Sequence, residues 1–250
     1  MSDSNPTETR KCQSCKKAES ETVVVRNCSR CKSAAYCSHD CQKADWKAHK
    51  KVCASNAQSN IGPGSQSATD VNATQSTKAL EVDFLKPFHR LDAKTWLHDR
   101  TEKDTFKLLV DTYRLRLDDD YTFLGDIEAD SLYGGARDGG RASFRRFLKL
   151  VERKPHLLPS WWTPAKAVEC VRYGMDSSNW SCLGSAVEKH DITEHYGNNL
   201  MPMQLRMFGE EVFGTGPAGH DGTEMRKMQM KAERGEGVAA TLDWSHLWAR

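Results

Sequence analysis

The sequence shows no long apolar run, no pattern that would lead us to expect a secretory leader, and almost no net charge. No stretch approaches the roughly 18 apolar residues that a membrane-spanning helix needs, so we expect no contact with a membrane. Residues 1–10 are polar and lack the apolar segment of a signal peptide. A formal net charge of +2 selects neither nucleic acid nor a lipid surface as a partner. We therefore expect the protein in the cytoplasm or nucleus, where thiols stay reduced.

Cysteine is present, but it is unevenly distributed. Seven of the nine cysteines lie between Cys12 and Cys53, and the other two are Cys170 and Cys182. In a reducing compartment a dense group of cysteines indicates metal binding rather than disulfides. Seven is also an odd number, which does not fit a fully paired disulfide framework.

The spacing within this segment supports metal binding. The potential donors form four pairs, and two or three residues separate the members of each: Cys12 and Cys15, Cys28 and Cys31, Cys37 and Cys41, His49 and Cys53. A C-x2-C turn supplies two thiolates together, and two donors four positions apart lie on one face of a helix. Eight donors make two tetrahedral sites with no position left for water, so we expect two structural zinc ions. Sequential and interleaved pairings remain open at this point.

One part of the segment resembles a known family. Tyr36-Cys37-Ser38, followed by Cys41-Gln42, Trp46, His49 and Cys53, resembles a MYND-type zinc finger over residues 12–53. The gap between Cys15 and Cys28 is long for that pattern, but every ligand position is present. The resemblance implies a cross-braced fold. Its first zinc ligands would be Cys12, Cys15, Cys37 and Cys41, and its second Cys28, Cys31, His49 and Cys53.

The resemblance also implies a function for the finger. MYND-type fingers act as protein-interaction modules that take short proline-containing peptides, and Gln42 and Trp46 match the positions that contact them. A tryptophan face packs well on a proline ring. The alternative role for Trp46 is to fill the small core of the finger, and both roles are compatible. We thus expect a zinc-binding adaptor that acts in transcriptional or other regulation.

Nucleic-acid binding is the alternative function. Between Arg10 and Cys53 there are 11 Lys and Arg against 4 Asp and Glu, a charge that can meet phosphate. Part of this charge is cancelled by the seven zinc-bound thiolates. The segment has neither C2H2 spacing nor a helix arranged to read base edges. Nucleic acid is therefore the weaker of the two expectations.

Three further features are predicted from the first 79 residues. The β-branched run at Val23–Val25 predicts a short strand. Ser38 is placed to cap the helix that carries Cys41. Residues 54–79 are rich in Ser, Asn, Gln, Thr and Gly, which indicates a flexible linker between two independent parts.

From residue 80 onward, apolar residues recur at helical spacing and strand signals are few, so we expect a mainly α domain over residues 80–234 and a tail over 235–250. C-terminal regions like residues 80–250 occur on fungal MYND proteins. Helices are expected at 101–117, 144–151, 164–174, 185–197, 200–213 and 223–234. Ser185 and Glu188 suggest a capping box, and Gly174 a helix end.

No enzymatic activity is expected. The string from Gly214 to Gly219 satisfies G-x-G-x-x-G but follows a predicted helix, not the strand that a dinucleotide site requires. His190 and His195 are five positions apart, on different faces of a helix, so a shared ion is not expected. Cys170 and Cys182 are interpreted as buried thiols. MYND fingers also occur beside SET methyltransferase domains, but the Asn-His motif of those enzymes is absent.

Overall fold

The structure is a computed structural model. The residues it describes are 10–28, 31, 33–38, 40–42, 44–46, 48–49, 52–53, 79–126, 128–134, 136 and 138–236. The predicted linker lies outside the described residues except for residue 79, and so does the predicted tail after residue 236. No helix among the described residues is long and apolar enough to cross a membrane.

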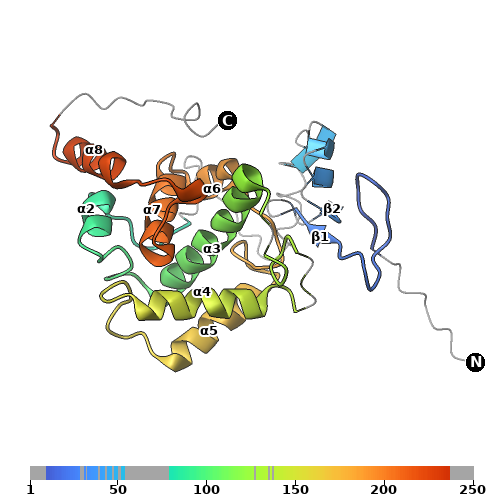
Figure 1. The fold of residues 1–250 in the computed structure, drawn as a ribbon, viewed down its shortest axis with the longest axis horizontal. Coiled ribbons are helices and arrows are strands. Elements are labelled where there is room, and N and C mark those ends of the chain that lie inside the picture. The colour runs from blue at the N-terminus through green and yellow to red at the C-terminus, as the bar shows by residue number, and fades with distance from the viewer. Residues whose placement is uncertain are drawn as a thin grey trace, which may run out of the picture.

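The larger part of the molecule is helical, as the apolar spacing predicts (Figure 1). Its helices are α2 (Pro87–Asp92), α3 (Glu102–Leu124), α4 (Arg141–Arg153), α5 (Pro164–Met175), α6 (Lys189–Tyr196), α7 (Met201–Phe213) and α8 (Thr223–Glu233), with a short 3-10 turn, η1 (Pro217–Gly219), after α7. Helix α3 packs against α4, α5, α7 and η1 and is the centre of this part.

The sequence of α3 explains its central place. The Thr101 side chain accepts a hydrogen bond from the Asp104 backbone N–H at its start, and Gly125 ends it with φ of +69°. Between these ends, buried residues occur on all faces of the helix rather than on one stripe. A helix buried all round belongs in the interior of a domain.

Helix α4 is amphipathic and lies along one side of α3 (Figure 1). Its apolar stripe consists of Phe144, Phe147, Leu148 and Val151, all buried, as the sequence pattern predicts. The chain becomes extended at Lys154, the residue before Pro155, because proline disfavours a helical conformation in its predecessor.

Three local predictions are wrong. Helix α5 continues past Gly174 to Met175, and the Gly174 backbone lies so close to Val110 and Leu183 that a Cβ there would come within 3.1–3.3 Å of their side chains. Helix α6 begins at Lys189 rather than beside Ser185. Its capping box is formed by Glu188 and Asp191.

The third wrong prediction is the strand in the N-terminal part. The predicted strand at Val23–Val25 is not formed. The strand β1 is Arg26–Asn27 instead, and it pairs with β2 (Ala35–Tyr36) in an antiparallel register that sets Arg26 opposite Tyr36. Pairing partners and not β-branched composition decide where so short a strand forms.

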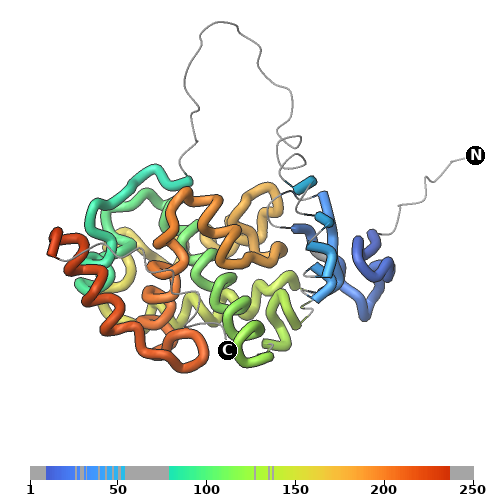
Figure 2. Tube along the Cα trace, turned by 90° about the horizontal axis from the view of Figure 1, so that it is seen from above, coloured from blue at the N-terminus to red at the C-terminus, as the bar shows by residue number. Residues whose placement is uncertain are grey.

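The helical part and the N-terminal part have separate hydrophobic clusters, and cysteines make up most of the N-terminal one. Figure 2 shows the N-terminal part at one end of the molecule and α8 at the other. Among the described residues, the Tyr121 hydroxyl of the helical part donates a hydrogen bond to Asp40 Oδ1 of the N-terminal part at 2.8 Å, and this bond is exposed.

Candidate metal centres

Two C-x2-C turns and one helix carry the potential zinc ligands. In the first turn, the Cys12 backbone N–H donates to the Lys17 carbonyl at 2.8 Å, and Lys11 pairs with Ala18 in an isolated bridge. In the second, the Cys28 backbone N–H donates to the Ala34 carbonyl at 2.7 Å. These bonds fold each turn tightly enough to direct two thiols to one side.

The helix begins just after Ser38, as predicted. The Ser38 hydroxyl accepts a hydrogen bond from the Cys41 backbone N–H at 3.1 Å, and the described residues among 40–53 are all helical. Cys41, His49 and Cys53 project from this helix, and Cys37 lies at the end of β2 just before it. One short helix therefore contributes ligands to both sites.

The first cluster contains Cys12, Cys15, Cys37 and Cys41, whose sulfur atoms all lie within 4.8 Å of one another. The Sγ atoms of Cys15 and Cys37 are 3.4 Å apart, and those of Cys37 and Cys41 are 3.6 Å apart. A tetrahedral site with Zn–S bonds of about 2.3 Å has edges of about 3.8 Å. A disulfide would need sulfurs about 2.05 Å apart. The spacing therefore fits a shared zinc ion and excludes disulfides within this cluster.

The second cluster contains Cys28, Cys31, His49 and Cys53, and all four residues are buried. The Sγ atoms of Cys28 and Cys53 are 3.9 Å apart, and Cys31 Sγ lies 3.5 Å from His49 Nε2. The two clusters interleave along the chain, so of the two pairings that the spacing left open the structure has the cross-braced one. Each ion would tie a C-x2-C turn to a later pair of donors.

The protonation of the thiols suits a metal site. A hydrogen bond from the Cys28 side chain lowers the pKa of Cys31 to about 4, although burial opposes that change. Burial raises the pKa of Cys12, but hydrogen bonds from backbone N–H groups outweigh it and bring the pKa to about 6. Each cluster thus holds a cysteine whose pKa is shifted toward the thiolate, the form that binds zinc. Cys37 shifts the other way, because burial and hydrogen bonds to the neighbouring sulfurs raise its pKa to about 12.

Each cluster supplies all four ligands that a structural zinc ion needs. Four sulfurs in one cluster, and three sulfurs with one imidazole in the other, fill the four positions of tetrahedral zinc. No ligand position remains for water or substrate. The clusters are consistent with two structural zinc ions and offer no catalytic metal position.

Of the two predicted peptide-binding residues, Trp46 lies next to the second cluster. Trp46 is half-buried, packs against the hydrophobic cluster of this part, and has its ring centroid 5.9 Å from that of His49. Gln42 is 7% exposed. Trp46 therefore fills the small core, the alternative role considered from sequence, while part of its side chain remains accessible.

Sequence reasoning missed the role of Tyr36 as a support for the second cluster. Its ring meets the His49 ring edge-on at 5.9 Å, and its hydroxyl donates to Asp45 Oδ2 at 2.8 Å. His49 thus contacts the rings of both Tyr36 and Trp46. The signal in the sequence was the tyrosine directly before Cys37, which is already part of the motif.

Neither cluster includes the residues for which the sequence predicted no catalytic or metal-binding role. His190 Nε2 is 3.2 Å from Glu194, while the His195 ring stacks on Trp180 at 3.6 Å between centroids. Gly214 ends α7 and leads into the η1 turn. Cys170 and Cys182 are buried. Within the described ranges, the two cysteine-rich clusters are the groups of donors arranged for a metal ion.

Comparison with known proteins agrees with this geometry. The family model of the MYND finger matches residues 7–53. Tudor domain-containing protein 1 of Oryzias latipes is 33% identical over 76 residues, which are 23% of this chain and 7% of that protein. SET domain-containing protein 14 of Caenorhabditis elegans is 45% identical over 39 residues, 16% of this chain and 9% of that protein. No solved structure matches.

These relatives share only a small segment with this chain, which spans less than a tenth of the length of either. The match to the family model includes all eight donors of the two clusters. Residues 7–53 of this chain are therefore a MYND finger, with two Cys/His clusters suited to zinc.

Proposed function

We propose that this protein is a zinc-binding adaptor, without enzymatic activity, whose finger docks short proline-containing peptides of a partner protein. MYND fingers are in general protein-interaction modules, which supports the broader part of this proposal. We place the adaptor in the cytoplasm or nucleus, in transcriptional or other regulation.

The observation that carries the proposal is the position of Trp46. Its ring is half-buried against the second metal cluster, so the zinc ion that holds His49 would also hold the ring in place. A tryptophan fixed in this way presents a rigid apolar face without losing side-chain entropy on binding. A proline ring in an extended peptide is a suitable partner for such a face.

The test is binding of proline-containing peptides by the Trp46→Ala variant. Buried aromatic anchors at interfaces contribute about 2 kcal/mol or more, so we expect affinity to fall by roughly thirtyfold. A peptide array followed by fluorescence polarisation on the best peptide would measure the change. Zinc content should stay the same, because Trp46 is not a ligand.

Val52→Ala is the matched control, because Val52 is an exposed apolar residue of the same helix with 49% of its surface accessible. It should leave peptide affinity within about twofold, as surface substitutions usually do. Equal binding by wild type and Trp46→Ala would contradict the proposed docking surface.

The second candidate is a nucleic-acid-associated regulator, favoured by the excess of basic residues in the finger. The lysines at positions 43, 47, 50 and 51 lie outside the described residues. Binding of DNA or RNA that weakens steeply with salt and is lost on substitution of Lys47, Lys50 and Lys51 would favour this function.

A further inference from the structure

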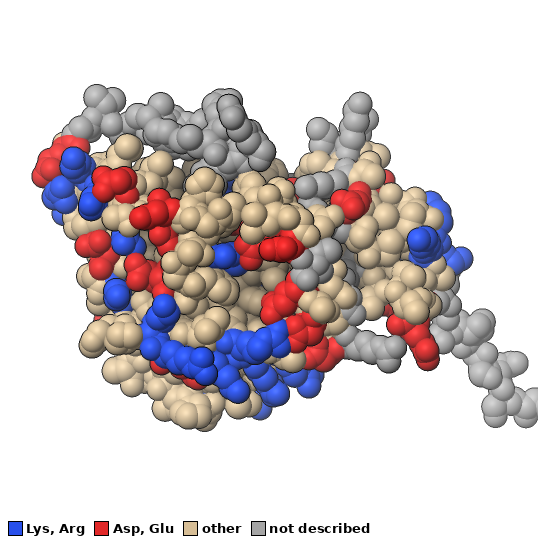
Figure 3. All heavy atoms as spheres, in the orientation of Figure 1, with Lys and Arg blue, Asp and Glu red and all other residues tan. Residues whose placement is uncertain are grey.

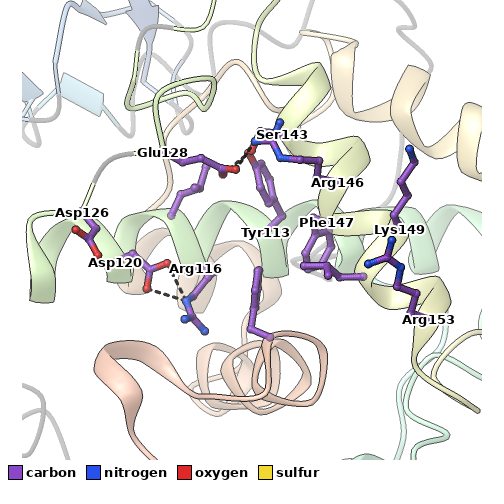
Figure 4. A pocket seen from close by; sticks show the side chains of 13 residues that line it. Tyr113, Arg116, Asp120, Asp126, Glu128, Ser143, Arg146, Phe147, Lys149 and Arg153 are labelled. Carbon is purple, nitrogen blue, oxygen red and sulfur yellow. Dashed lines mark hydrogen bonds and ion pairs between the residues drawn. The ribbon is translucent and has the colours of Figure 1, made fainter.

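A second candidate surface lies in the helical part, far from the finger in sequence. A cleft of about 620 Å³ opens between α3, α4 and the end of α7 (Figure 4). Its apolar lining comes from all three helices: Tyr113, Leu117, Phe147, Leu150 and Phe213. The side chains of Leu150 and Phe213 remain half-buried, so a ligand in the cleft can bury apolar surface that is now accessible to solvent.

The charged side chains at the two ends of the cleft differ in whether they form ion pairs with described residues. At one end, Arg116 donates to Asp120, and Arg146 pairs with Glu128 and Asp130. At the other end, Lys149 and Arg153 are exposed, and no described carboxylate forms an ion pair with either. The cleft therefore offers two cations that are not neutralised by the described part of the chain.

Lys149 and Arg153 belong to a longer row on α4. Arg141, Arg145, Lys149 and Arg153 follow one another at intervals of four residues, and all are exposed. Residues four apart are neighbours on a helix surface, so the row contains three repulsive pairs, each unfavourable by about 0.2–0.5 kcal/mol. Arg141 also stands in the first turn, where the helix dipole disfavours a cation. The basic row therefore lowers the stability of α4 rather than raising it.

The basic row stands out from the rest of the helical part. Residues 141–154 hold six Lys and Arg and one Glu, whereas residues 79–236 as a whole hold 23 Lys and Arg and 26 Asp and Glu. Figure 3 shows the resulting band of blue side chains over α4. A local basic band on an otherwise acidic body attracts an anion of limited size, while the surrounding carboxylates repel a long polyanion.

We infer that this cleft and the basic row of α4 dock an acidic protein segment that inserts an apolar side chain between Leu150 and Phe213. The row spans about 18 Å at 1.5 Å per residue, longer than a small molecule but suited to a short peptide. The carboxylates of the segment would pair with Lys149, Arg153 and Arg145. Nucleic acid fits less well, because Asp120, Asp126 and Glu128 line the same cleft.

The test uses the full chain and a fluorescein-labelled peptide of about 12 residues, made of Asp and Glu with Leu and Phe at its centre. Fluorescence polarisation should detect binding that weakens at least tenfold in Lys149→Glu/Arg153→Glu, because two attractive contacts become repulsive. Leu150→Ala should weaken binding by roughly threefold, through lost apolar contact. A probe with Gln and Asn in place of the acids should not bind.

The matched control is Lys103→Glu/Arg172→Glu. These two cations are also exposed, lie on α3 and α5 away from the cleft, and change the net charge by the same amount. The control should keep wild-type affinity. Equal loss in both double variants would mean that only total charge matters and would overturn the proposal.

Three further measurements separate the alternatives. Lys149→Glu alone turns two repulsive pairs into attractive ones, so the Tm should rise by about 2 °C while binding weakens, which excludes unfolding as the cause. Trp46→Ala should bind the acidic probe normally, since this surface does not depend on the finger. Loss of probe binding in Trp46→Ala, or binding of a single-stranded oligonucleotide but not of the peptide, would each overturn the inference.

Discussion

Removal of zinc by a chelator, or the substitution Cys37→Ser, is expected to unfold residues 12–53 and leave the helical domain folded. The hydrophobic cluster of the finger consists of six of the eight cysteine and histidine donors together with Ala34, Tyr36 and Trp46. A unit of about 40 residues with so small a core depends on its metal, and structural zinc supplies an apparent folding free energy of about 10–16 kcal/mol. The loss of either ion therefore removes most of the folding free energy.

The helical domain should be unaffected for a structural reason. Its hydrophobic cluster contains no residue of the finger. The described hydrogen bond between Tyr121 and Asp40 is exposed, and such a bond contributes only about 1 kcal/mol. Two separate transitions are expected in calorimetry or limited proteolysis, and only the one assigned to the finger should depend on zinc.

Cys170→Ala is the control for this prediction, because Cys170 is buried in the helical domain and belongs to neither cluster. It should leave two zinc ions per chain in native mass spectrometry, while Cys37→Ser should bind fewer. A single joint transition in the wild-type protein would contradict the independence of the two parts. A native preparation without stoichiometric zinc would contradict the metal sites.

The second large effect is expected from Asp111→Ala in the helical domain. Asp111 on α3 accepts hydrogen bonds from Arg114 Nη2 at 2.6 Å, Ser181 Oγ at 2.8 Å and the Tyr196 hydroxyl at 2.5 Å. Arg114 also donates to the carbonyls of Cys182 and Ser185. The side chains of Asp111 and Arg114 are at most 1% exposed. This network joins α3 to the 176–188 connection and to α6.

Loss of Asp111 would leave the Arg114 cation buried without its counter-charge. Breaking a buried ion pair in this way costs about 3–5 kcal/mol, which corresponds to a fall in Tm of roughly 10 °C for a domain of this size. Thermal unfolding followed by circular dichroism would measure it. The zinc-dependent transition should not move.

A double-mutant cycle distinguishes the buried charge from a simple cavity. Asp111→Ala/Arg114→Met removes both charges and should be more stable than Asp111→Ala alone, because the unpaired cation is gone. Asp126→Ala, at an exposed carboxylate just after α3, should change stability by no more than about 0.5 kcal/mol. A double variant no more stable than Asp111→Ala would show that the cost is packing and not charge.

The sequence alone located the finger and its eight donors, because ligand identity and spacing are local properties that a C-x2-C turn or a helical interval of four expresses directly. It also located most helices, whose apolar stripes and caps, such as Thr101 before α3, lie within a few residues of one another. Prediction failed at Gly174 and Ser185, whose backbones lie against residues distant in sequence, Val110 and Arg114 respectively.

Tertiary structure alone decided how the pieces combine. Spacing permits either pairing of the donors, and only folding brings Cys12 beside Cys37 and Cys28 beside Cys53. The pattern of α3 places Asp111 and Arg114 among apolar residues but does not show that Ser181 and Tyr196 complete their bonds. The cleft beside α4 exists because α3, α4 and α7 meet there, and packing between segments far apart in the chain leaves no periodic signal in the sequence.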